Sequence, residues 1–254
     1  MAIIGYCIID GKKSPQSATG IEKNSTEILD YEDIAMVISE VASTGQELLK
    51  SIQNAHNGMS NGHAEHPGLR FNSVIDQAMK QETVLPLRFP TLFDGREAAE
   101  SVLKSHYDDF RVQLDELQGR IEYGIKVMWD GDQRKEAMLE EAKKSSYVDQ
   151  AVLSGKAFLQ KRYAIYKRDQ QFRADGREQV EAIHAYLEDL IEDLNYQTLL
   201  SDNYLLNGSY LLPRHALPQF EPRLERMEVD FPELKFIYSG PWAPFHFTEI
   251  ELNV

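Results

Sequence analysis

The chain has 254 residues, of which 42% are hydrophobic and 10% aromatic, and its formal charge is −14. This length and apolar content are sufficient for two packed domains. No apolar run approaches the length of a membrane span, so no lipid membrane is expected as a partner. The negative charge argues against a nucleic-acid partner, which would require a basic surface. The single cysteine excludes an internal disulfide and is typical of a protein of the reducing cytoplasm.

The first half of the chain combines short strands with helices. Residues 2–9 form an apolar run that predicts a strand, since the run is too short for a helical span and lacks the basic start of a signal peptide. Residues 34–38 are apolar on both faces, which predicts a central strand covered on both sides. Residues 84–89 predict a short strand at a sheet edge or with a bulge, because Pro86 cannot donate a ladder hydrogen bond. A helix is expected from about Arg96 to Leu117.

The second half begins with a strand over residues 121–129, where apolar and polar side chains alternate. A long helical region follows, with Gly176 as an expected break and a last helix over residues 180–194. The elements expected after it are strands around residues 197–202 and 209–213 with a turn at Asn207–Gly208, a helix over 220–229, and a strand over 234–238.

This order predicts an α+β protein of two domains. Residues 1–118 form an N-terminal α+β domain that ends in a bridging helix, and its topology is left open. Residues 119–254 follow the order βαββαβ, which is that of a ferredoxin-like fold with an enlarged helical first crossover. The boundary is placed near Gly119, where a helical period changes to a strand period.

The segment Ser239–Phe247 places one Trp and two Phe around two prolines, directly after a glycine. Proline fixes its own φ and biases the preceding residue toward extended backbone, so the rings are held on a stiff chain. Such a segment favours docking over catalysis. The candidates for partner binding are therefore Pro241, Trp242, Pro244 and Phe245. In the alternative, these rings close the end of the C-terminal core or cover the domain interface.

Two arginines, Arg88 and Arg120, stand beside apolar strand residues, where a guanidinium needs a carboxylate or a partner's carbonyls. One interpretation gives each of them an interdomain salt bridge, with Glu122 as a possible acceptor. The other makes each a contact to a partner. Both interpretations stay open.

Metal and nucleophile chemistry have little support in the sequence. A cluster of His56, His63, Glu65 and His66 has loose spacing, lies beside Gly and Asn, and has no cysteine near it, so a solvated loop is expected and no metal. Cys7 lies within an apolar strand, which predicts a buried and inert thiol. No cofactor is expected.

Five segments form a pattern along the chain: Val84–Phe93, Leu117–Val127, Ser154–Leu159, Asn207–Leu212 and Ser239–Phe245. In order and spacing they resemble the F/L family of gas vesicle proteins (GvpF/GvpL) over nearly the whole chain, and the F member is favoured. Two positions depart from the family pattern, Pro90 in place of a usual Gly and Ala243 in place of a usual Pro.

The resemblance implies a minor, non-enzymatic component of the gas vesicle, located on that structure within the cytoplasm. It implies that the protein binds the small hydrophobic main shell protein and limits its aggregation during assembly, together with other gas vesicle accessory proteins. Two rivals remain. One is an enzyme with an interdomain cleft that uses Arg88, Glu122 and His106 or His66. The other is a regulatory ligand-binding module with a closed apolar cavity.

Overall fold

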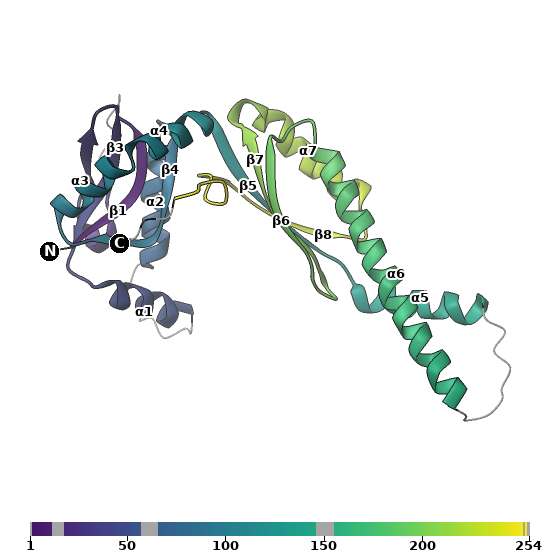
Figure 1. The fold of residues 1–254 in the computed structure, drawn as a ribbon. Coiled ribbons are helices and arrows are strands. Elements are labelled where there is room, and N and C mark those ends of the chain that lie inside the picture. The colour runs from purple at the N-terminus through teal and green to yellow at the C-terminus, as the bar shows by residue number, and fades with distance from the viewer. Residues whose placement is uncertain (1, 12–17, 57–65, 146–154, 251, 253–254) are drawn as a thin grey trace. The chain divides into compact units, whose positions relative to one another are not determined.

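The computed structural model describes residues 2–11, 18–56, 66–145, 155–250 and 252 (Figure 1). It combines helices with two four-stranded antiparallel sheets, which confirms the predicted mixture of helix and sheet. The chain divides into two compact units, each described here by itself. One consists of Met1–Glu122 with Pro241–Val254, and the other of Tyr123–Gly240.

The sheet of the first unit has the strand order β2-β3-β1-β4. Its inner strand β3 is buried along its length except at Glu40, as the run of apolar residues predicted. Pro86 lies in the edge strand β4, and the pairing of β4 with β1 shifts its register directly after the pair Cys7–Pro86. The short strand β2 was not expected. The strands are β1 (Ala2–Asp10), β2 (Glu27–Tyr31), β3 (Ile34–Val41) and β4 (Val84–Phe93).

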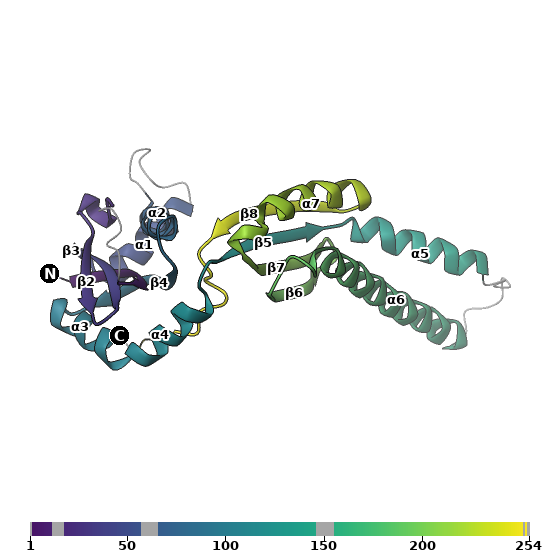
Figure 2. The same ribbon diagram turned by 90° about the horizontal axis from the view of Figure 1, so that it is seen from above.

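Helices cover both faces of this sheet (Figures 1 and 2). The helices α1 (Gly45–His56) and α2 (Pro67–Met79) follow β3, and the Phe71 ring of α2 lies 5.1 Å from the Tyr6 ring. The predicted helix after β4 is two helices, α3 (Arg96–Ser105) and α4 (Tyr107–Glu116). They separate at His106, whose φ of −112° and ψ of 17° are not helical and whose Nδ1 lies 3.1 Å from the Val102 carbonyl oxygen.

The sheet of the second unit has the order β6-β7-β5-β8. In β5 the side chains of Tyr123, Ile125 and Val127 are buried, as the alternation predicted, and Lys126 is exposed. Glu122, which the alternation placed on the wet face, is buried instead. The strands are β5 (Arg120–Met128), β6 (Asp193–Ser201), β7 (Tyr204–Pro213) and β8 (Lys235–Trp242).

Three helices accompany this sheet: α5 (Gly131–Ser145), α6 (Gly155–Leu187) and α7 (Leu217–Asp230). The helices α6 and α7 contact one another and pack on one sheet face, and the N-terminal half of α6 extends beyond the sheet (Figures 1 and 2). The break expected at Gly176 is wrong, since α6 is continuous there. A helical glycine costs about 1 kcal/mol, which burial of Phe172 and Val180 on either side outweighs.

Two further expectations about this unit are wrong. The helix expected to reach Leu194 ends at Leu187, and Leu194 belongs to β6. The expected Asn207–Gly208 turn lies inside β7, where Gly208 pairs with Tyr196 of β6. Gly208 has a packing reason to be glycine, because a Cβ there would approach the Tyr210 ring to 2.8 Å.

The compact units differ from the predicted domains at one end of the chain. Residues 241–254 group with the first unit, whereas the sequence analysis assigns them to the C-terminal domain of residues 119–254. The division into domains at 118/119 stays a prediction. Within the described parts of the chain, no helix has both the length and the apolar character needed to cross a lipid bilayer.

Candidate functional site

The aromatic segment after β8 is a tight turn in which small residues are buried and rings are partly exposed. Ala243 and Pro244 are buried, Phe245 is half-buried, and Trp242 is 37% exposed. The carbonyl of Pro244 accepts hydrogen bonds from the Phe247 N–H at 3.2 Å and from the Thr248 hydroxyl at 2.6 Å. Because the turn closes on a proline, its backbone has little freedom left, as the sequence analysis expected of this segment.

Two side chains tie the residues after this turn to the rest of the first unit. Glu122 has a side chain only 5% exposed, and its carboxylate accepts a hydrogen bond from the His246 N–H at 2.9 Å and lies 2.6 Å from His246 Nδ1. The Gln113 amide of α4 bonds the backbone of Glu249 twice, donating to its carbonyl at 3.1 Å and accepting from its N–H at 2.9 Å. The segment is thus fastened on both sides of residue 247.

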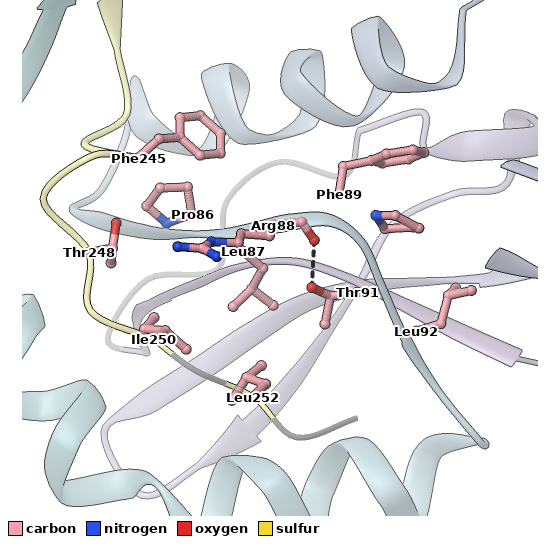
Figure 3. A pocket seen from close by; sticks show the side chains of 11 residues that line it. Pro86, Leu87, Arg88, Phe89, Thr91, Leu92, Phe245, Thr248, Ile250 and Leu252 are labelled. Carbon is pink, nitrogen blue, oxygen red and sulfur yellow. Dashed lines mark hydrogen bonds between the residues drawn. The ribbon is translucent and has the colours of Figure 1, made fainter. Parts of the chain in front are cut away.

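A groove of about 470 Å³ lies between the edge strand β4 and the C-terminal segment. Figure 3 shows the side chains of β4 on one side and those of the C-terminal residues on the other. Arg88 is exposed, and its carbonyl accepts a hydrogen bond from the Thr91 hydroxyl at 2.6 Å. The lining is otherwise mainly apolar, with Pro86, Leu87, Phe89, Leu92, Phe245, Ile250 and Leu252.

Trp242 lines a second groove, of about 370 Å³, together with α2. Leu69 of α2 is 69% exposed and forms part of the same lining. The remaining lining residues are polar or charged, among them Asp76 and Lys80. Burial raises the pKa of the Asp76 carboxyl above its usual range. This groove therefore combines two exposed apolar side chains with polar and charged ones.

The structure thus divides the predicted partner-binding residues among different places. Arg88 and Phe245 line one groove, Trp242 lines another, and Pro244 is buried beneath the turn. Arg120 lies at the junction of α4 and β5, where its guanidinium donates to the carbonyls of Glu116 and Gln118. Pro241 is part of β8.

The residues proposed for an enzymatic site do not form one cluster. Arg88 and His106 line a groove of about 590 Å³ with Asp109 of α4. The carboxylate of Glu122 is bound by His246, and His66 stands at the N-terminus of α2.

His63 and Glu65 lie outside the described residues, which contain no group of three or more potential metal ligands. Cys7 is buried in β1, and burial raises the pKa of its thiol, as expected of an inert cysteine.

Two residues of the site were missed from the sequence. Leu69 falls on the apolar period of a helix, which predicts a core position although the side chain is largely exposed. Gln113 gives no sequence signal, because its role depends on the backbone of Glu249, more than a hundred residues away. Only the fold reveals that contact.

A mixed helix-and-sheet protein with two antiparallel sheets and a fastened aromatic segment is the class that these observations define. The chain belongs to the family described as gas vesicle synthesis protein GvpL/GvpF, whose model matches residues 2–249. Membership implies a role in gas vesicle formation.

Relatives agree with this assignment. Gas vesicle protein F1 of Halobacterium salinarum is 22% identical over 228 residues, which cover 89% of this chain and 82% of the relative. Gas vesicle protein L of a Streptomyces species is 27% identical over 189 residues, covering 70% and 67%.

Among solved structures, the crystal structure of gas vesicle protein GvpF from Microcystis aeruginosa is similar with a TM-score of 0.75 and 16% identity, covering 98% of this chain and 99% of that one. That of GvpF from an Anabaena species gives 0.73 and 17%, covering 99% and 97%. These likenesses establish the fold.

Proposed function

We propose that this protein acts in gas vesicle formation by binding the small hydrophobic main shell protein and limiting its aggregation before it joins the vesicle. Its place is then the gas vesicle within the cytoplasm, in company with other gas vesicle accessory proteins, and its role is structural and not enzymatic. Support comes from the family and from the exposed apolar side chains of the fastened segment.

One observation carries the proposal: Trp242 is 37% exposed and Leu69 69% exposed, and both line the same groove of about 370 Å³. A ring presented on a fixed turn loses little conformational entropy when a partner docks, and Trp is among the residues that most often dominate interface energies. The groove along β4 lies beside the same turn and is lined by several apolar side chains together with Arg88 and two threonines.

The architecture fits a scaffold for such a surface. We infer a modified ferredoxin-like fold for the C-terminal part, because β5, β6, β7 and β8 have the sheet order β6-β7-β5-β8 with helices after β5 and after β7. The enlarged crossover is then the pair α5 and α6. The fastened turn follows directly from the last strand of this arrangement.

The test is suppression of aggregation. Purified main shell protein is diluted from denaturant, and its light scattering is followed with and without this protein. We expect the wild type to lower the scattering, and Trp242→Ala combined with Leu69→Ser to lose that effect while the melting temperature shifts by only a few degrees.

The matched control is Val229→Ser, which removes a side chain that is 75% exposed on α7, and it should retain full suppression. Full suppression by the double variant would overturn the proposed contact. A loss of about 3–5 kcal/mol of stability on Trp242→Ala would instead identify the ring as a plug of the core.

A further inference from the structure

The N-terminal part of α6 has a charge opposite to that of the whole protein. Residues 155–177 contain seven Lys or Arg and two Asp, in a chain whose formal charge is −14. Both aspartates are already engaged: Asp169 accepts from Arg168 at 2.7 Å, and Asp175 accepts from Arg134 of α5 at 2.5 Å. This stretch therefore has five more basic than acidic residues (seven minus two).

The same part of α6 exposes tyrosines. Tyr163 is 62% exposed and Tyr166 60% exposed, at a spacing that places both on one side of the helix. By helical periodicity, Gln170, Arg173 and Arg177 lie on the same side of α6. The Gln170 amide donates a hydrogen bond to the Tyr166 hydroxyl at 2.7 Å, and both arginines are exposed. We call these five residues the basic tyrosine face. Tyr and Arg are the residue types most enriched at the energetic centres of protein interfaces.

The exposed side of α4 has the complementary character. It carries Asp108, Asp109, Asp115 and Glu116, all exposed, around Val112, which is 55% exposed. We call these five residues the acidic valine face. Arg111 of the same helix already bonds Asp115 and lies close to Asp10 and Asp33. Exposed carboxylates around an apolar centre match a row of guanidinium groups beside tyrosine rings.

The two faces differ in length. A helix rises about 1.5 Å per residue, so the basic tyrosine face (residues 163 to 177) spans roughly 21 Å and the acidic valine face (residues 108 to 116) roughly 12 Å. The acidic face can therefore cover about half of the basic one. A nucleic-acid backbone would satisfy the arginines but offers no apolar counterpart for Tyr163 and Tyr166 along its phosphates. A helix with carboxylates and a central valine offers both.

From these observations we propose that two copies of this chain associate, with the basic tyrosine face of α6 in one copy packed against the acidic valine face of α4 in the other. The contact is electrostatic at its edges and apolar at its centre. It uses neither the groove of Trp242 nor that of β4, so it is independent of the proposed binding of shell protein.

The test is sedimentation velocity of the full chain over a wide range of protein concentration at low and high salt. We expect concentration-dependent association that weakens as salt rises, because exposed charges are screened. Arg173→Glu with Arg177→Glu should weaken it at least about tenfold, since like charges then face each other. Lys126→Glu with Lys235→Glu changes the net charge equally on exposed strand residues and should leave association unchanged.

A charge exchange makes the assignment of both faces specific. Asp108→Lys with Glu116→Lys should also abolish self-association, but mixing this variant with Arg173→Glu/Arg177→Glu should restore a complex of the two. All four positions are exposed, so each variant should melt like the wild type. A chain that stays monomeric at every concentration and salt, a failure of the mixture to associate, or arginine-dependent binding to DNA without self-association would each overturn the proposal.

Discussion

The sheet of β1 to β4 and the sheet of β5 to β8 have the same strand order when the strands of each are counted from its first: second, third, first, fourth. They differ in what connects and covers them. In the first sheet, only a short 3₁₀ turn (Ile21–Lys23) is described between the first two strands, and helices cover both faces. In the second, the large helices α5 and α6 occupy that connection, and α6 and α7 share one face.

This difference in helix placement explains why neighbouring side chains are both buried in β3 but not in β8. In β3, Met36 and Val37 point to opposite faces and both are at most 2% exposed. In β8, Tyr238 donates a hydrogen bond to the Leu224 carbonyl of α7, while its neighbour Ile237 is 45% exposed. One strand order therefore supports either a doubly buried sheet or a sheet with an open face. The helices decide which.

The largest expected effect on stability comes from placing a charge on each face of the two sheets. In the first sheet, Met36→Asp and Val37→Asp should each cost about 5 kcal/mol or more, because either position buries an unpaired charge. In the second, only Ile125→Asp should do so, and Lys126→Asp on the other face should be tolerated. Urea unfolding followed by circular dichroism measures all four. If Val37→Asp folded normally, one face of the first sheet would have to be open.

Replacing a large buried ring in each unit should show whether the two units unfold separately. Phe71 and Phe220 are both fully buried, in the first and the second unit respectively. Replacing either by Ala should cost about 3–5 kcal/mol. If the units are independent, calorimetry should show two transitions, with each variant lowering only one. A single transition lowered equally by both variants would contradict the two-domain prediction.

A smaller effect is expected from pH, through a histidine of the second unit. His184 of α6 lies against the Tyr196 and Tyr210 rings, and burial lowers the pKa of its imidazole below the usual value. Because the unfolded chain binds the proton more readily, this histidine's contribution is present above the unfolded pKa of about 6.5 and declines as pH falls below it.

His184→Gln should therefore remove part of the decline in unfolding free energy between neutral and mildly acidic pH. Denaturant titrations at a series of pH values measure this slope. An unchanged slope would mean that the imidazole is protonated with equal ease in the folded and unfolded chain.

The sequence predicted those elements whose pattern depends on local chemistry. The alternation at Tyr123, Ile125 and Val127 identified the buried face of β5, and the apolar run at Ile34 identified an inner strand. Predictions failed where tertiary contacts override local preference. Gly208 signals a turn by type, but its missing side chain serves the Tyr210 ring inside a strand.

In the candidate site, too, the sequence predicted the local features but not those that depend on tertiary contacts. Proline spacing identified the stiff turn, but the burial of Ala243 and Pro244 and the exposure of Leu69 depend on which surface the turn meets. The contacts of Glu122 with His246 and of Gln113 with Glu249 join residues more than a hundred positions apart. No local pattern encodes such pairs, so they follow only from the fold.

The smallest expected effect is at the open face itself. Ile237→Ser should change the free energy of unfolding by no more than about 0.5 kcal/mol, because an exposed side chain loses little on truncation. Its neighbour provides the matched control: Tyr238→Ser removes a half-buried ring and its hydrogen bond to α7, and should cost about 3 kcal/mol. Chemical denaturation of both variants at low protein concentration measures the difference. Equal losses at positions 237 and 238 would mean that another surface covers this side of β8, and the contrast between the two sheets would then disappear.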